Sequence, residues 1–74
     1  MTAIPLSELK VGQTKCLCQF EDEQLGGKLM AMGMLPGASI QLVRRAIAGN
    51  TLYIKFNGYC MAIRRSEAMS ILLN

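Results

Sequence analysis

The cysteines of this chain, three in number, are the residues whose chemistry first suggests a function. Cys16 and Cys18 are separated by one residue, so on a strand of period two both sulfurs point to the same face. Cys60 lies in another strand-like run, and three thiolates together would bind a soft metal ion. A structural zinc site needs a fourth cysteine or histidine ligand, and the chain has no histidine. We therefore predict that Cys16 and Cys18 are small core residues beside Phe20, with a cysteine-based metallochaperone as the less favoured alternative.

The acidic run Glu21-Asp22-Glu23 raises the question of a hard-metal site, for instance for ferrous iron. Three consecutive residues at the start of a helix point in divergent directions, so their carboxylates do not converge on one ion. Negative charge is favourable at a helix N-terminus, because the peptide dipoles leave partial positive charge there. We interpret the run as a helix start and expect no metal site and no cofactor.

Catalysis lacks its usual groups in this sequence. Without histidine, the serines have no base of the triad type to activate them, and the usual proton shuttle near neutral pH is missing. The chain also contains no G-x-x-x-x-G-K-[ST] loop that would hold a phosphate. The sequence therefore predicts a binding module and not an enzyme.

Two basic doublets, Arg44-Arg45 and Arg64-Arg65, are candidates for a phosphate-binding face. Small β-barrels bind nucleic acids in this way, usually with exposed aromatic side chains that stack on bases. Tyr53 is the aromatic residue most clearly predicted to point outward, and the net charge is only +3. Adjacent arginines on a strand point to opposite faces and keep it solvated. A nucleic-acid-binding barrel is therefore the second hypothesis, and we expect no direct nucleic-acid contact.

The methionines near the middle of the chain give a stronger indication of a binding surface. Met32 continues the apolar stripe of a predicted helix, so we place it in the core. Met30 lies well round the helical wheel from that stripe, while Met34 and Leu35 fall beyond the helix end. We predict that these last three residues form an exposed, adaptable contact patch. Arg64 and Arg65 are predicted to be charged anchors at its rim.

The length of 74 residues allows one domain, which we expect to span residues 1–74. A chain of this size buries about 60% of its unfolded surface and gains only about 3–5 kcal/mol from its core. Since 51% of the residues are hydrophobic, some apolar side chains must remain outside. No stretch is long enough to cross a membrane, the first five residues do not resemble an export signal, and the odd cysteine count favours a reducing cytosol.

The elements that position these residues follow from periodicity and turn signals. We predict a helical turn at residues 5–9, a helix from the acidic run to a cap at Gly33, and a turn capped by Ser66. The Gly26-Gly27 pair in the helix suggests close packing against the sheet. The predicted strands cover residues 14–20, 39–47, 51–57, 59–64 and 70–73. Five short strands and one helix favour a mainly β, partly open small barrel, whose closure shields the sheet edges.

The segment Leu29-Met30-Ala31-Met32-Gly33-Met34-Leu35-Pro36-Gly37 resembles the Leu-x-x-Leu-Gly-x-x-Pro-Gly signature of the ferrous-iron transport protein A (FeoA) family. Met32 stands where the second leucine of that signature is usual. Residues 6–12, 40–46 and 62–68 are similar to the opening, second strand and hydrophobic-Arg-Arg-x-x-Ala ending of the family. The hairpin departs from the family pattern, because residues 46–51 lack its two prolines and its acid, although Gly49-Asn50 still supports a turn.

The resemblance implies an SH3-like barrel with an inserted helix. It also implies a cytosolic accessory of the membrane ferrous-iron transporter (FeoB), which carries a cytosolic G-protein domain. The same fold is appended to iron- and manganese-dependent repressors after a DNA-binding helix-turn-helix, for which we expect no room in this chain. The expected function is regulation of the transporter by protein contact, without insertion into the membrane. An exposed apolar patch also permits a homo-oligomer.

Overall fold

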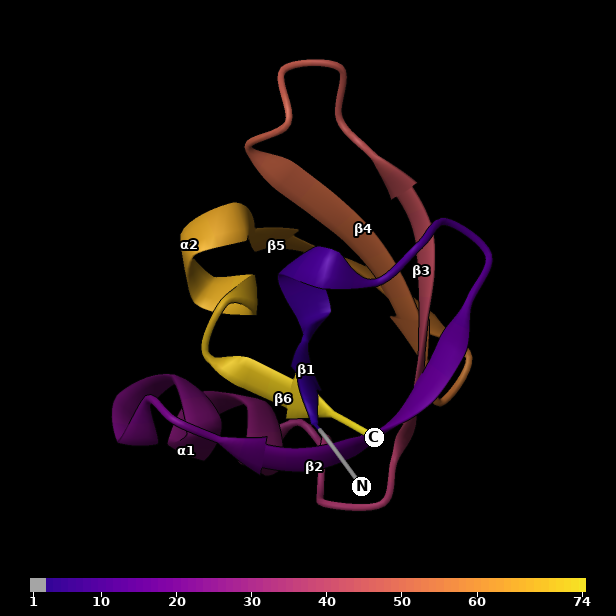
Figure 1. Ribbon diagram of the computed structural model, residues 1–74. Helices are drawn as coiled ribbons and strands as arrows, with labels where there is room; N and C mark the ends of the chain where they lie inside the picture. The colour runs from indigo at the N-terminus through magenta and orange to yellow at the C-terminus, as the bar shows by residue number, and fades with distance from the viewer. Residues whose placement is uncertain (1–2) are drawn as a thin grey trace.

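The computed structural model describes residues 3–74, so Met1 and Thr2, part of the segment tested for an export signal, lie outside the described residues. The elements are β1 (Ile4–Pro5), the 3-10 turn η1 (Leu6–Glu8), β2 (Thr14–Phe20), α1 (Glu23–Ala31), β3 (Ser39–Arg45), β4 (Thr51–Phe56), β5 (Tyr59–Arg64), α2 (Arg65–Ala68) and β6 (Ile71–Leu73). The expected mainly β architecture with one longer inserted helix is confirmed (Figure 1). There are six strands among the described residues and not about five, because Ile4–Pro5 pairs with β6.

The strands form one sheet in the order β1-β6-β2-β3-β4-β5, with antiparallel neighbours throughout. β3, β4 and β5 are a meander, in which residues 46–50 form the first connection and Asn57-Gly58 the second. Asn57 and Gly58 both have positive φ, 51° and 78°, as a two-residue hairpin turn requires. β2 joins the meander to the terminal strands, and the sheet curls so that its core lies inside (Figure 1). None of the helices in residues 3–74 is long and apolar enough to span a membrane.

The core is formed by apolar side chains that alternate along the strands, as predicted for β3 and β4. On β4, Leu52, Ile54 and Phe56 are buried, while Lys55 is exposed. Within residues 3–74 the buried core residues are Leu6, Leu9, Leu17, Leu29, Met34, Ile40, Leu42, Leu52, Ile54, Phe56, Ile63, Ala68, Ile71 and Leu73.

β2 presents the opposite face from the one predicted, so the placement of Cys16 and Cys18 in the core is wrong. Both cysteines are exposed, whereas Leu17 between them is only 2% exposed. The pairing of β2 with β6 shifts register between Leu17 and Gln19, which is a bulge that inserts one extra residue. Phe20, three residues after Leu17, therefore returns to the core side, and simple alternation fails across the strand.

The start of α1 is fixed by Asp22, whose carboxylate accepts hydrogen bonds from the N–H groups of Gln24 and Leu25 at 3.0 and 3.1 Å. The acidic run is therefore a helix start, as predicted, with Asp22 as its N-cap. At the start of α2 the predicted cap is wrong. Arg64 is the N-cap, and its N–H donates to Glu67 Oε1 at 3.0 Å, while Ser66 is exposed.

The end of α1 reverses the predicted positions of two methionines. Gly33 has a φ of 95° and donates its N–H to Met30 O, and Met34 donates to Leu29 O at 3.0 Å. These two bonds define a Schellman motif, in which the residue after the glycine folds back against the helix. Met34 is therefore fully buried, and its predicted exposure is wrong. Met32 is the C-cap and is 57% exposed, so its predicted place in the core is also wrong.

Arg44 and Arg45 point to opposite sides of β3, as predicted. The Arg44 guanidinium lies 4.0 Å from the ring centroid of Tyr53 on the outer face. Arg45 is half-buried and donates to the carbonyl oxygens of Ser7 and Leu9, both at 2.6 Å. Arg45 thus ties the η1 segment to the sheet through charge-assisted hydrogen bonds.

The two glycines of α1 differ in their surroundings, which gives a matched stability test. A Cβ on Gly26 would lie 2.9 Å from Phe20 Cβ, whereas a Cβ on Gly27 would meet nothing within 4 Å. We expect Gly27→Ala to raise the free energy of unfolding by about 0.5–1 kcal/mol through helix propensity. Gly26→Ala should lower it by about 1 kcal/mol, because the steric conflict exceeds that gain. Urea denaturation of both variants checks this, and equal shifts would contradict the packing of α1 on Phe20.

Removal of the Arg45 guanidinium should loosen the η1 segment. We expect Arg45→Met to lower the free energy of unfolding by about 1.5–3 kcal/mol, because two carbonyl groups lose a charged donor. Arg44→Met is the control, and its loss should stay below about 1 kcal/mol, since an exposed cation–π contact contributes little. The midpoints of denaturant unfolding of Arg45→Met and Arg44→Met give the two losses of stability. A loss for Arg44→Met as large as that for Arg45→Met would show that the carbonyl contacts are not the stabilising ones.

Candidate functional site

The residues at the end of α1 form an exposed apolar surface, which we call the helix-end patch and define as Met30, Met32 and Leu35. Their side chains are 42%, 57% and 52% exposed, respectively. The Schellman motif produces this arrangement, because it sends Met34 inward and leaves the residues on either side of the turn in solvent. Two of the predicted contact residues, Met30 and Leu35, are therefore exposed, and Met32 takes the place of Met34 at the surface.

Beside the helix-end patch lies an apolar hollow of about 260 Å³ at the beginning of β5. It is lined by Met32, Phe56, Tyr59, Cys60 and Met61. The rings of Phe56 and Tyr59 are tilted against each other with centroids 6.4 Å apart. Because Met32 belongs to both features, the patch and the hollow are continuous.

Sequence reasoning did not identify Tyr59 and Met61 as part of this surface. The signal was present in the alternation of β5, where Tyr59, Met61 and Ile63 share one face. Burial increases along that face, from an exposed Tyr59 through a half-buried Met61 to a buried Ile63. The beginning of β5, which lies near the end of α1, is therefore the part of this face that remains exposed.

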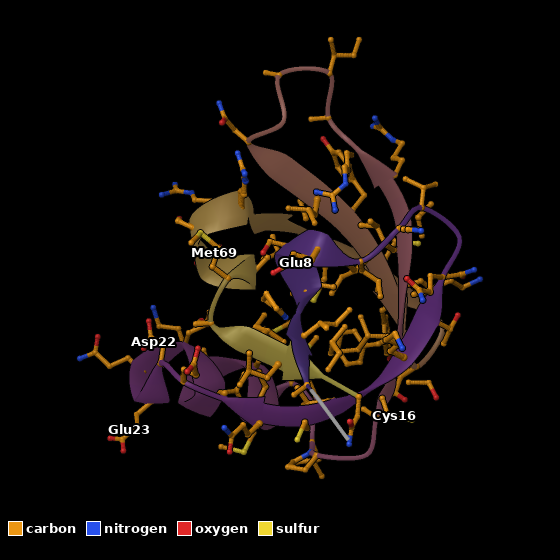
Figure 2. The ribbon with its side chains drawn as sticks, viewed as in Figure 1. Glu8, Cys16, Asp22, Glu23 and Met69 are labelled. Carbon is orange, nitrogen blue, oxygen red and sulfur yellow. The ribbon has the colours of Figure 1, made fainter. Side chains whose placement is uncertain are left out.

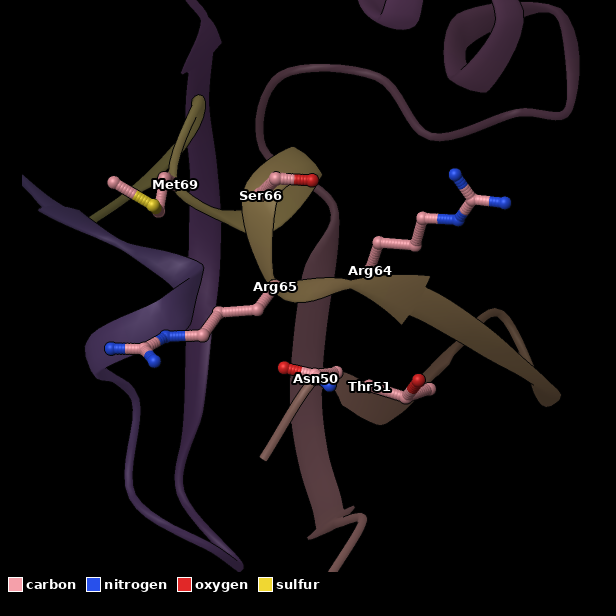
Figure 3. Close-up of a pocket in the computed structure, with 6 residues that line it drawn as sticks. All are labelled: Asn50, Thr51, Arg64, Arg65, Ser66 and Met69. Atoms are coloured by element: carbon pink, nitrogen blue, oxygen red, sulfur yellow. The ribbon is translucent and has the colours of Figure 1, made fainter. Parts of the chain in front are cut away.

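Arg64 and Arg65, the predicted rim anchors, lie at the other end of β5. Together with Asn50, Thr51, Ser66 and Met69 they line an open hollow of about 480 Å³. Figure 3 shows the two guanidinium groups pointing away from each other, Arg64 on one side of the strand end and Arg65 on the other. Both arginines are exposed. Because their guanidinium groups diverge, they are not arranged to bind one anion together.

The outer face of the β3-β4-β5 meander is basic. Arg44, Lys55 and Arg64 are exposed there, with the half-buried ring of Tyr53 beneath Arg44. The register places Tyr53 opposite Ala62, and Lys55 opposite Cys60, on this same face. No acidic residue occurs in β3, β4 or β5, so the positive charge of this face is not offset within the meander.

The groups considered for metal binding are not brought together. Among residues 3–74 there is no set of three or more cysteine, aspartate or glutamate side chains arranged to hold an ion. In Figure 2, Asp22 and Glu23 lie at the start of α1, whereas Cys16 lies toward the opposite end of β2. All the cysteines are exposed, Cys60 on β5 and the other two on β2.

Comparison with known proteins gives the family. The model of the FeoA domain family matches residues 4–74, while no curated protein matches the chain. The chain is similar to the FeoA-like protein of Clostridium acetobutylicum, with 29% identity, a TM-score of 0.89 and coverage of 100% of this chain and 88% of that one.

Two more distant structures share the fold alone. The zinc-complexed FeoA of Stenotrophomonas maltophilia, described as an SH3 domain protein, is 22% identical with a TM-score of 0.85, over 97% of this chain and 91% of that one. A manganese-dependent transcriptional repressor in complex with manganese is 14% identical with a TM-score of 0.87, over 99% of this chain and 36% of the repressor. The expected SH3-like fold is confirmed.

The family assignment agrees with the geometry of the molecule. Its members are small SH3-like domains implicated in ferrous-iron transport, and they are not a known enzyme family. The matched region includes the helix-end patch and the whole of the sheet. This chain belongs to the FeoA family.

Proposed function

We propose that this protein is a cytosolic accessory of a membrane ferrous-iron transporter of the FeoB type and that it regulates the transporter by direct protein contact. It acts without catalysis, carries no iron, and reaches the inner membrane only through the transporter. The observation that supports this role most directly is the exposed helix-end patch in a member of an iron-transport family.

The physical basis is the exposure of three large, flexible apolar side chains on a small domain. Exposure of Met30, Met32 and Leu35 does not stabilise the fold. Burial of these side chains against a partner is favourable, because it releases the water around them. Methionine adapts to irregular partner surfaces because its side chain is unbranched and polarizable. The apolar hollow beside Met32 extends the same surface onto the sheet.

The nucleic-acid hypothesis is supported by the basic outer face of the meander. Binding of single strands also requires aromatic platforms for the bases. Tyr53 is half-buried beneath Arg44, and Tyr59 belongs to the opposite, apolar side of β5.

The metallochaperone hypothesis requires converging thiolates, and Cys16 and Cys60 lie on strands that are not neighbours. Protein contact is therefore the favoured function.

The direct test is titration against the cytosolic portion of the ferrous-iron transporter from the same organism. Binding should be seen by calorimetry in at least one nucleotide state of the G-protein domain, together with a changed GTPase rate. Nuclease treatment should not alter the binding. Absence of interaction in every nucleotide state, and also with detergent-solubilised full-length transporter, would refute the proposed function.

A charge placed on the helix-end patch should separate binding from stability. We expect Met30→Asp to weaken transporter binding by more than about tenfold, since burying an unpaired carboxylate costs well over 1.4 kcal/mol. Its free energy of unfolding should change by no more than about 0.5 kcal/mol, because the side chain is exposed. Melting curves and titrations of the same preparation give both values.

Two further variants serve as controls for that experiment. Val11→Asp changes a 59% exposed apolar side chain on the turn before β2 and should leave binding unchanged. Met34→Asp introduces a charge at a fully buried position and should unfold the protein. A large drop in melting temperature for Met30→Asp with unchanged binding would place Met30 in the core and remove it from the contact surface.

A further inference from the structure

We infer that β5 is a docking edge that accepts an extended segment of the partner as an added strand, and that this segment alternates acidic with apolar side chains. This inference rests on the proposed function and deepens it, because it assigns the kind of segment that binds and the backbone groups that hold it. Three observations support it: an unpaired edge, an apolar hollow on its inner side and a basic face on its outer side.

The first observation is the edge. β5 is the last strand of the sheet and pairs only with β4 among the described residues. The two-residue turn at Asn57-Gly58 makes Phe56 and Tyr59 a hydrogen-bonded pair, so the next pair, which contains Cys60, is not hydrogen-bonded across the ladder. The N–H and C=O groups of Cys60 and Ala62 therefore point away from β4, and none of the hydrogen bonds within residues 3–74 engages them from the outer side.

This edge is also free of the features that usually block strand addition. Natural edges carry lysine, proline, a bulge or an inward-pointing charge. From Tyr59 to Ile63 the strand has none of these, and its register with β4 is continuous. The edge ends at Arg64, whose N–H is taken by Glu67, so the available length is the segment 59–63. The opposite sheet edge, Ile4–Pro5, is two residues long and contains proline.

The second observation concerns the inner side of this edge. Tyr59 and Met61 point toward the core side of the sheet and line the 260 Å³ apolar hollow with Met32. In an added strand, side chains alternate between the two faces. Those on the inner face would lie beside Tyr59 and Met61, where the hollow offers an apolar pocket. Backbone pairing with pockets for alternate side chains is the general mode of strand addition.

The third observation concerns the outer side. Side chains of the added strand that face outward would lie beside Cys60, Ala62 and Arg64, with Lys55 on the neighbouring strand. Cys60 and Ala62 are small, so they leave the two exposed cations accessible. No acid lies on the meander, and the Glu67 carboxylate accepts from the Arg64 N–H at the end of the edge, so carboxylates on the added strand are attracted mainly by Lys55 and the Arg64 guanidinium. The edge thus favours an added strand whose inward-facing side chains are apolar and whose outward-facing side chains are acidic.

A second copy of this chain is a poorer occupant than an acidic segment. Pairing of β5 with β5 of another molecule would join two basic outer faces in one continuous sheet. Each copy would bring Arg44, Lys55 and Arg64 to that face, and each chain has a net charge of +3. Like charges gathered in this way oppose association.

Amide hydrogen exchange followed by NMR tests the inference, with the cytosolic portion of the transporter as the first probe. In the free protein the amides of Cys60 and Ala62 should exchange rapidly, since no acceptor holds them. In the complex both should slow by at least about tenfold, as a newly formed ladder requires. Added salt should weaken the complex, because the outer contacts are ionic.

Ala62→Pro provides a backbone test, because it removes an outward N–H that the β4 ladder does not use. It should weaken binding by about tenfold. Ala62→Val is the control, because it keeps that N–H, and its dissociation constant should stay within about threefold of the wild-type value. Arg64→Glu tests the ionic contacts and should both weaken binding and reduce the dependence of binding on salt. If Ala62→Pro does not fold, the exchange rates in the wild-type complex decide the matter.

The second probe is a synthetic peptide, Glu-Val-Asp-Ile-Glu-Val-Asp, blocked at both ends, compared with the same composition in an order that breaks the alternation. Protection of Cys60 and Ala62 by the alternating peptide, and not by the reordered one, supports the inference without the transporter. Binding of the transporter without such protection would overturn the inference and leave the proposed function standing. Failure of both probes would overturn both, and protection that rises with protein concentration alone would assign the edge to a second copy.

Discussion

The hydrogen bond from the N–H of Met34 to the carbonyl of Leu29 is the constraint on which both the core and the surface depend. It forms only because Gly33 adopts a positive φ that side chains disfavour. The bond turns one methionine into the centre of the barrel and leaves its neighbours along the chain in solvent. A single backbone geometry therefore supplies a core residue to a small domain and at the same time creates its exposed apolar surface.

Much of the fold follows from local patterns, and the errors occur where a single residue changes the phase of a pattern. The alternation of β4, the helix start at the acidic run and the helix end at Gly33 were all predictable from residue types. Cys16 and Cys18 were misplaced because a bulge in β2 depends on pairing with β6, which lies far away in the sequence. Met32 was misplaced because the helical wheel no longer applies at the C-cap, and Met34 because the Schellman motif returns a residue beyond the helix end to the core. Of the candidate site, Met30 and Leu35 could be predicted to be exposed, whereas the hollow beside β5 required the meander and α1 to be placed together.

The meander supports two different surfaces on one strand. β5 presents apolar side chains on its inner face near α1 and small or basic ones on its outer face. Among the described residues β5 pairs only with β4, while β2 pairs with β6 and β6 with β1 on the other side of the sheet. The contacts of Arg45 with the carbonyl groups of Ser7 and Leu9 fix the N-terminal segment to β3. These stabilising contacts of Arg45 therefore lie on β3 and η1, and not on β5.

The pairing of Ile4 with Leu73 joins strands from opposite ends of the sequence. Contacts of such high sequence separation carry the largest loop-closure entropy and are the slowest to form. The meander needs only residues 39–64 and two short connections, so its contacts are the local ones. The order of folding implied by this topology begins with the hairpins and ends with the terminal strands, and β5 would be in place while the barrel is still incomplete. The terminal strands are therefore the costliest part of the sheet to close, whereas the edge strand β5 depends only on the local contacts of the meander.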